Sequence, residues 1–200
     1  MVKGKKMAML AVLSAVIAVI SFLPIRTLGL EITLSMVPVA VGAICFGPAA
    51  GAFLGGVFGV VSFLQCLGWS PFGAALLAIN PLYTFLVCIP TRLLAGWISG
   101  WIFRAFSRSK KHWLKVAGYP VASFAAALLN TVLFMTALVV CFYHTELIQG
   151  FAEQLGAANP FWFVILFVGI NGVVEIAAGF VLAAPAARAV TAALKHTRKE

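Results

Sequence analysis

Charged residues are scarce in this 200-residue chain: they make up 10% of it, whereas 63% of it is hydrophobic. A soluble globular domain has about a quarter charged residues, so the composition excludes one. The mean hydropathy of +1.09 is typical of helices that face lipid. The uncharged runs approach or exceed the roughly 20 residues that cross a bilayer, and none alternates as a membrane β-barrel strand does. We therefore predict an all-α integral membrane protein.

The sequence also lacks the signatures of several catalytic sites. It has no G-x-x-x-x-G-K-[ST] loop for nucleotide phosphates, no H-E-x-x-H zinc motif and no Ser–Lys pair at membrane depth. The three histidines fall in predicted loops or in the tail, and the four cysteines lack metal-ligand spacing. We expect no enzymatic activity, no metal and no cofactor, so that any step driven by ATP requires another chain.

Six apolar segments predict six transmembrane helices in a single domain over residues 1–200. The segments are 7–23, 32–46, 49–65, 81–103, 116–143 and 160–193. The first follows three lysines as a signal peptide would, but its apolar run is long and lacks a small-residue cleavage pattern. No internal repeat is evident, which weighs against a secondary transporter built from inverted repeats.

The positive charges predict the orientation of these helices. Of the fourteen Lys and Arg residues, all but Arg26 and Arg92 precede the first segment, lie between the fourth and fifth, or lie at the end of the sixth or after it. With six spans these regions share one side, and the positive-inside rule makes it the cytoplasm, with both termini there. The net charge of +9 thus reports topology in a plasma membrane, and we expect no nucleic-acid partner.

Glycines recur inside the apolar segments, where a soluble helix would avoid them. Gly51, Gly55 and Gly59 lie four residues apart, so they share one helix face. Gly96 and Gly100 repeat this spacing. In lipid, where helices associate through close van der Waals contact, such stripes let two backbones approach. We predict that most of these glycines serve packing within the chain.

The first segment carries a similar stripe made of alanine. Ala11 and Ala15 lie four residues apart, and Ala8, Ser14 and Ala18 are also small. Because small faces also form contacts between subunits, we single out this face as the surface for a partner protein.

Four polar residues are predicted to lie near the bilayer midplane. Arg92 and Asn171 lie roughly 16 to 18 Å into their segments, Asn130 lies near the middle of its own, and Glu175 follows Asn171 by one helical turn. An arginine at the centre of a membrane helix costs about 2.5 to 3.5 kcal/mol on insertion scales. Residues on three helices must therefore compensate one another or serve a ligand.

Two interpretations of this polar layer stay open. Arg92 and Glu175 can form a structural ion pair while the asparagines tie helices together. Alternatively the four residues form the floor of a polar cavity open to the outside and roofed by residues 24–33 and 65–80. In that case the planar guanidinium of Arg92 suits a carboxylate or phosphate. The side chains of Asn130 and Asn171 then bind hydroxyl and amide groups.

Gln65, Asn80 and Tyr83 complete the candidate site at its outer rim. Asn80 and Asn159 each precede a proline, as in the paired Asn-Pro boxes of six-span water channels. Both boxes lie at outer helix starts, however, so they cannot meet at the midplane. The ordinary explanation is an Asn N-cap followed by proline in the first turn, although Asn80 can still reach a ligand from the rim.

Two stretches of sequence resemble a known family. They are "ITLSMVPVAVGAICFGPAAGAFLGGVFGVVSFL" (32–64) and "NPLYTFLVCIPTRLLAGWISG" (80–100). In the first, the Pro, Gly-Ala, Gly-Pro and spaced Gly pattern is similar to that of substrate-binding S-components of energy-coupling factor (ECF) vitamin transporters. The second is most similar to the pantothenate-type members.

The resemblance implies a six-helix S-component bundle in a bacterial plasma membrane that captures a vitamin with high affinity. It also implies a transmembrane T-component, which contacts Ala-x-x-x-Ala patterns such as Ala11 and Ala15, and two cytoplasmic ATPases that drive toppling of the S-component. The family's pocket lies in the outer halves of the last three helices, where Arg92, Asn130 and Asn171 fall, with Glu175 behind them.

Pantothenate, an anion with hydroxyls and an amide, suits these residues, although folate, riboflavin and cobalamin stay open. The alternative function is that of a secondary transporter or channel that works without partner proteins.

Overall fold

The structure is a computed structural model that describes residues 3–22, 25–27, 30–32 and 34–196. Helices account for nearly all of this part, which confirms the helical prediction, and one short antiparallel hairpin accompanies them. The elements are α1 (Lys3–Ser21), β1 (Ile25–Thr27), β2 (Leu30–Ile32), α2 (Met36–Phe46), α3 (Pro48–Gln65), α4 (Pro71–Ile79), α5 (Pro81–Ser107), α6 (His112–Phe142), α7 (Glu146–Gln154), α8 (Pro160–Ala178), the π-helical turn η1 (Gly179–Ala183) and α9 (Ala184–His196).

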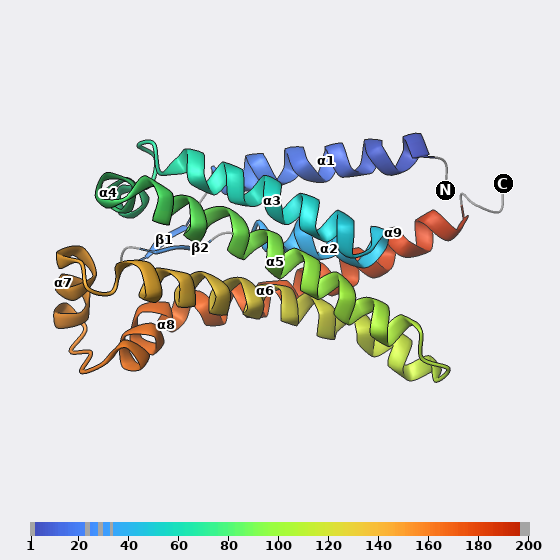
Figure 1. Ribbon diagram of the computed structural model, residues 1–200. Coiled ribbons are helices and arrows are strands. Elements are labelled where there is room, and N and C mark those ends of the chain that lie inside the picture. Colours follow the sequence, from blue (N-terminus) through green and yellow to red (C-terminus); the bar gives the residue numbers. More distant parts are fainter. Residues whose placement is uncertain (1–2, 23–24, 28–29, 33, 197–200) are drawn as a thin grey trace.

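The long helices run roughly along one axis, so their connections gather at two ends (Figure 1). The start of α1, the α5–α6 connection and the end of α9 lie at one end. We name it the basic end, because Arg104, Arg108, Lys110 and Lys111 lie at or near the α5–α6 connection. The β1–β2 hairpin, α4 and α7 lie toward the other, which we name the hairpin end.

Four helices in the described ranges are long and apolar enough to cross a membrane: α1, α3, α5 and α6. The chain therefore has the composition and helix lengths of a multi-pass membrane protein. Helix α2 has 11 residues and is about 16 Å long, too short to span a bilayer alone. Eight of its residues are buried, so α2 lies inside the bundle.

Two predicted segments differ from the observed helices. Residues 32–46 do not form one helix, because Ile32 pairs with Ile25 in the hairpin and α2 begins at Met36. Residues 160–193 are not continuous either. The chain leaves helical geometry at Gly169, whose φ of 37° and ψ of −129° suit glycine alone, and it widens into a π-helix at Gly179–Ala183.

Short helices also occupy two segments expected as loops. The Ser70 side chain accepts a hydrogen bond from the Gly73 amide at the start of α4, and the Thr145 side chain caps α7 in the same way. These caps satisfy amide groups that the first helical turn leaves without partners. Each of the two loops therefore contains a short helix of nine residues at the hairpin end.

The core has three tiers along the bundle axis. The central tier joins α1, α2, α3, α5 and α6 around Ile17, Leu54 and Phe58, all at most 2% exposed. A second tier near the basic end packs α2 against α6 and α9. A third, at the hairpin end, joins α4, α6, α7 and α8 and is rich in phenylalanine. The long helices are thus held at three levels.

Close approach of α3 and α5 confirms the predicted role of the glycine stripes. A Cβ atom built on Gly51 would clash with the backbone of Gly96, and one on Gly96 would clash with Gly51. A Cβ atom on Gly59 would lie 2.7 Å from Cα of Ile89. The two backbones meet where side chains are absent, which provides the van der Waals contact that holds helices together in lipid.

Gly55→Ala should lower the stability of the protein while Gly56→Ala should not. A Cβ atom on Gly55 would lie 2.9 Å from the carbonyl carbon of Arg92, whereas the nearest atom to one on Gly56 is a Leu93 methyl at 3.9 Å. We expect a loss of about 1–3 kcal/mol for Gly55→Ala, the usual cost of overpacking. Thermal unfolding of both variants in detergent measures this, and equal melting temperatures would contradict the interface described here.

Candidate functional site

Arg92 lies inside the bundle, with 8% of its surface exposed. Its guanidinium carbon is 4.8 Å from the ring centroid of Phe58 on α3 and 5.0 Å from that of Phe134 on α6. Two aromatic faces therefore flank the cation, an arrangement that stabilises a desolvated positive charge. The prediction that this arginine lies in the protein interior is confirmed.

The backbone of α5 holds one side of the guanidinium. Arg92 Nη1 donates to the carbonyl oxygens of Cys88 at 3.0 Å and Val87 at 3.3 Å. Each of these carbonyl oxygens has two lone pairs, so it can accept from the guanidinium as well as from a helical amide. Pro90, inside α5 between Cys88 and Arg92, lacks the N–H that would bond the Leu86 carbonyl.

Two buried polar atoms on α5 and α6 have no hydrogen-bond partner within the described part of the chain. Arg92 Nε is an unpaired donor, and Asn130 Oδ1, on α6, is an unpaired acceptor. Asn130 is 8% exposed and lies one helical turn from Phe134, which contacts the guanidinium. Leaving such groups unpaired costs about 1–3 kcal/mol each, so an unpaired buried donor and an unpaired buried acceptor are expected where a polar ligand binds.

Helix α8 brings a third polar segment to the same level. Gly172 packs toward α6, since a Cβ atom built on it would lie 3.8 Å from Thr131 Cγ2. Asn171 therefore has its backbone beside the Asn130 turn. The side chains of Asn171 and Glu175 lie outside the described residues, so the two interpretations of the Arg92–Glu175 pair stay open.

The three rim residues have separate surroundings. Gln65 is buried and its Nε2 donates to the carbonyl oxygen of Ser21, which ties the end of α3 to the end of α1. Asn80 accepts hydrogen bonds from the amides of Leu82 at 3.0 Å and Tyr83 at 3.1 Å, which confirms the N-cap interpretation. Tyr83 lies nine residues before Arg92, or about 14 Å along α5, and its ring meets Phe142 edge-on. These residues lie toward the hairpin end, away from Arg92.

Phenylalanine side chains fill the space between α4, α7 and α8. The ring of Phe72 on α4 lies 5.8 Å from that of Phe151 and 5.6 Å from that of Phe167, and Phe167 stacks on Phe163 at 4.9 Å. We name these four residues the aromatic cap. The cap lies at the hairpin end of the bundle, and Phe167 comes just before the break in α8 at Gly169.

The sequence interpretation missed both the aromatic cap and the two rings around Arg92. Phe134 could have been identified, because it follows Asn130 by one turn and shares its face. The position of Phe58 beside Arg92 depends on how α3 aligns with α5, and the glycine stripe indicates this alignment without determining it. Phe151 lies on a short helix that no long apolar run predicts.

The alanines of the predicted partner surface on α1 lie mostly at the outside of the described bundle. Ala11 and Ala15 are exposed, whereas Ile17 is fully buried and Leu13 packs against the central core. Only 11% of the predicted span in α1 is buried, the smallest share among the four long apolar helices of the described part. The exposed alanine face leaves room for another helix to approach closely.

Comparison with known proteins agrees with this architecture. Residues 5–187 match the family described as ECF transporter, substrate-specific component. The chain is also 31% identical over 158 residues to the Pantothenate transporter PanT of Leuconostoc mesenteroides subsp. mesenteroides, an alignment that covers 78% of this chain and 73% of that relative. The bundle has a buried polar layer with unpaired hydrogen-bonding groups and an exposed helix face of small residues. The chain that forms it belongs to the substrate-specific components of ECF transporters.

Proposed function

We propose that this chain is the S-component of a pantothenate importer and binds the vitamin at the Arg92–Asn130 layer. The observation that carries the proposal is the buried guanidinium with an unpaired Nε, flanked by aromatic rings, one of which lies a helical turn from the unpaired amide oxygen of Asn130. Pantothenate offers a carboxylate for the guanidinium, and hydroxyl and amide groups for Asn130. The relative named as a pantothenate transporter supports the same ligand.

The proposed topology has six spans in a bacterial plasma membrane, with the basic end in the cytoplasm. Helix α2 with its preceding hairpin forms the second span, and α8, η1 and α9 together form the sixth. The aromatic cap then faces the outside and closes the vitamin site from there, and Gln65, Asn80 and Tyr83 line its rim. Asn171 contributes to the site, and Glu175 lies behind it.

Transport in this proposal requires other proteins. The alanine face of α1 docks on a transmembrane T-component that carries two cytoplasmic ATPases. Their ATP cycle topples the S-component in the membrane and delivers the site to the cytoplasm. No helix of this chain hydrolyses ATP in this scheme, and the chain alone binds vitamin without moving it.

Binding and transport assays on the purified chain test the proposal. In proteoliposomes we expect saturable binding of labelled pantothenate without accumulation, and accumulation only after the T-component and ATPases are added. Mass spectrometry of the small molecule that copurifies with the chain identifies the ligand directly. Accumulation by the chain alone would instead identify a self-contained transporter, and tighter binding of folate, riboflavin or cobalamin would reassign the vitamin.

A further inference from the structure

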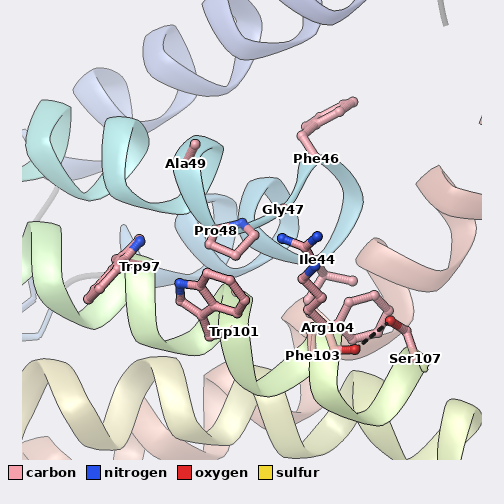
Figure 2. Close-up of a pocket in the computed structure, with 11 residues that line it drawn as sticks. Ile44, Phe46, Gly47, Pro48, Ala49, Trp97, Trp101, Phe103, Arg104 and Ser107 are labelled. Carbon is pink, nitrogen blue, oxygen red and sulfur yellow. Dashed lines mark hydrogen bonds between the residues drawn. The ribbon is translucent and has the colours of Figure 1, made fainter. Parts of the chain in front are cut away.

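A groove between the α2–α3 junction and the last turns of α5 lies near the basic end, and its lining does not include Arg92 (Figure 2). Its volume is about 520 Å³, within the 300–1,000 Å³ range of sites that hold small molecules. Apolar and aromatic side chains form most of its lining, and Arg104 is the one charged residue among the lining residues that the structure describes. The vitamin site accounts for none of these residues.

The groove changes from apolar to cationic along α5. Trp97, Trp101 and Arg104 are spaced four and three residues apart, so they share one helix face, and Figure 2 shows all three beside Pro48. Trp97 and Arg104 are about 10 Å apart along the helix axis. The interfacial layer of a bilayer is roughly 5–8 Å deep on each side. An arginine at headgroup level therefore leaves Trp97 at the edge of the hydrocarbon, where tryptophan is enriched.

The arginine is available to an anion. Its guanidinium carbon lies 5.0 Å from the ring centroid of Trp101, and none of the described residues that line the groove is acidic. Both tryptophans are more than two-fifths exposed, at 43% and 44%. Arg108, Lys110 and Lys111 follow within the next turn and connection, so this end carries a positive field that attracts negative headgroups.

We propose that this groove binds one anionic phospholipid of the phosphatidylglycerol class, with its phosphate on Arg104 and its glycerol and upper acyl chain against Trp101 and Trp97. The guanidinium supplies paired donors to phosphate oxygens. The indole rings supply the amphipathic surface that the glycerol region requires. A soluble phosphate would use the arginine but would leave the aromatic wall unoccupied.

Native mass spectrometry of the whole chain, released from detergent containing equal amounts of phosphatidylglycerol and phosphatidylcholine, tests this site. We expect the chain to retain the anionic lipid about fivefold more than the zwitterionic one. Arg104→Gln should abolish this preference, whereas Arg104→Lys should keep part of it. The matched control is Arg108→Gln, one turn further along and outside the groove lining. All variants should melt at the same temperature, because both arginines are exposed.

Several outcomes would overturn the proposal. These are an unchanged lipid preference in Arg104→Gln, an equal loss in the Arg108→Gln control, and equal retention of both lipids by the unmodified chain. Competition by excess soluble glycerol 3-phosphate would assign the groove to free phosphates. Dimers without lipid would assign it to a second copy of the chain. Pantothenate binding is measured separately, so failure here leaves the vitamin site untouched.

Discussion

Arg92→Ala lowers the affinity of the chain for pantothenate by more than tenfold. The expected loss is the 1.5–3 kcal/mol of a charge-assisted hydrogen bond, and each 1.4 kcal/mol is a factor of ten in the dissociation constant. The guanidinium is 8% exposed, so water does not screen its contact with a carboxylate as it would at the surface. Calorimetric titration of the purified chain measures the change.

A structural role for Arg92 predicts a different result. A neutral analogue of the vitamin distinguishes a structural role from a binding role. If the guanidinium binds the carboxylate, Arg92→Ala weakens the anion but barely affects an analogue whose carboxylate is replaced by an alcohol. If the guanidinium only supports the fold, Arg92→Ala changes the affinity for both compounds by the same factor or leaves both unchanged. Arg92→Lys should keep part of the preference for the anion, since it retains the charge but not the planar donor set.

Arg108→Ala is the control for removal of a positive charge from the same protein. This residue is exposed at the end of α5, at the basic end. Its removal should leave vitamin affinity unchanged. Unchanged affinity in Arg92→Ala would assign the arginine to the structural ion pair with Glu175, and Glu175→Gln would then lower the melting temperature.

The polar layer is predictable from the sequence because the rise per residue, counted from the start of a helix, gives the depth of each side chain in the membrane. Arg92 and Asn130 fall at similar depths on neighbouring segments, and the structure brings the guanidinium beside Phe134, one turn from Asn130. The immediate partners of the arginine are not predictable in this way. They depend on the rotation of α3 against α5 and on the carbonyls near Pro90, which only the packed bundle determines.

The glycine stripe shows what a spacing pattern can and cannot determine. Spacing of four residues predicts the packed face of α3, and the contacts of Gly51 and Gly55 confirm it. The break at Gly169 escapes the same reasoning, because glycine is common in regular membrane helices and does not by itself indicate a positive φ. Helices α4 and α7 have nine residues each, too few for a periodic signal to distinguish them from loops.

A paired substitution on α1, Ala11→Trp with Ala15→Trp, should abolish assembly with the T-component while leaving vitamin affinity intact. Both alanines are exposed, and the opposite face of α1 carries the contacts with α2 and α3 through Leu13 and Ile17. Two indoles on the exposed face therefore need no rearrangement of the bundle. They would, however, separate α1 from any helix that approaches the alanines closely, which removes the contact that association in lipid requires.

Copurification of the T-component and ATPases with a tagged chain measures assembly, and calorimetry on the same preparation measures pantothenate affinity. Val132→Trp with Val140→Trp is the matched control, since both valines are exposed on α6, at 50% and 78%. The control adds the same bulk to another apolar surface and should assemble normally. Weakened vitamin binding with normal assembly would show that the alanine face serves the site instead. Equal loss of assembly in the control would show that bulk anywhere on the bundle blocks the complex, because a specific docking face must distinguish α1 from α6.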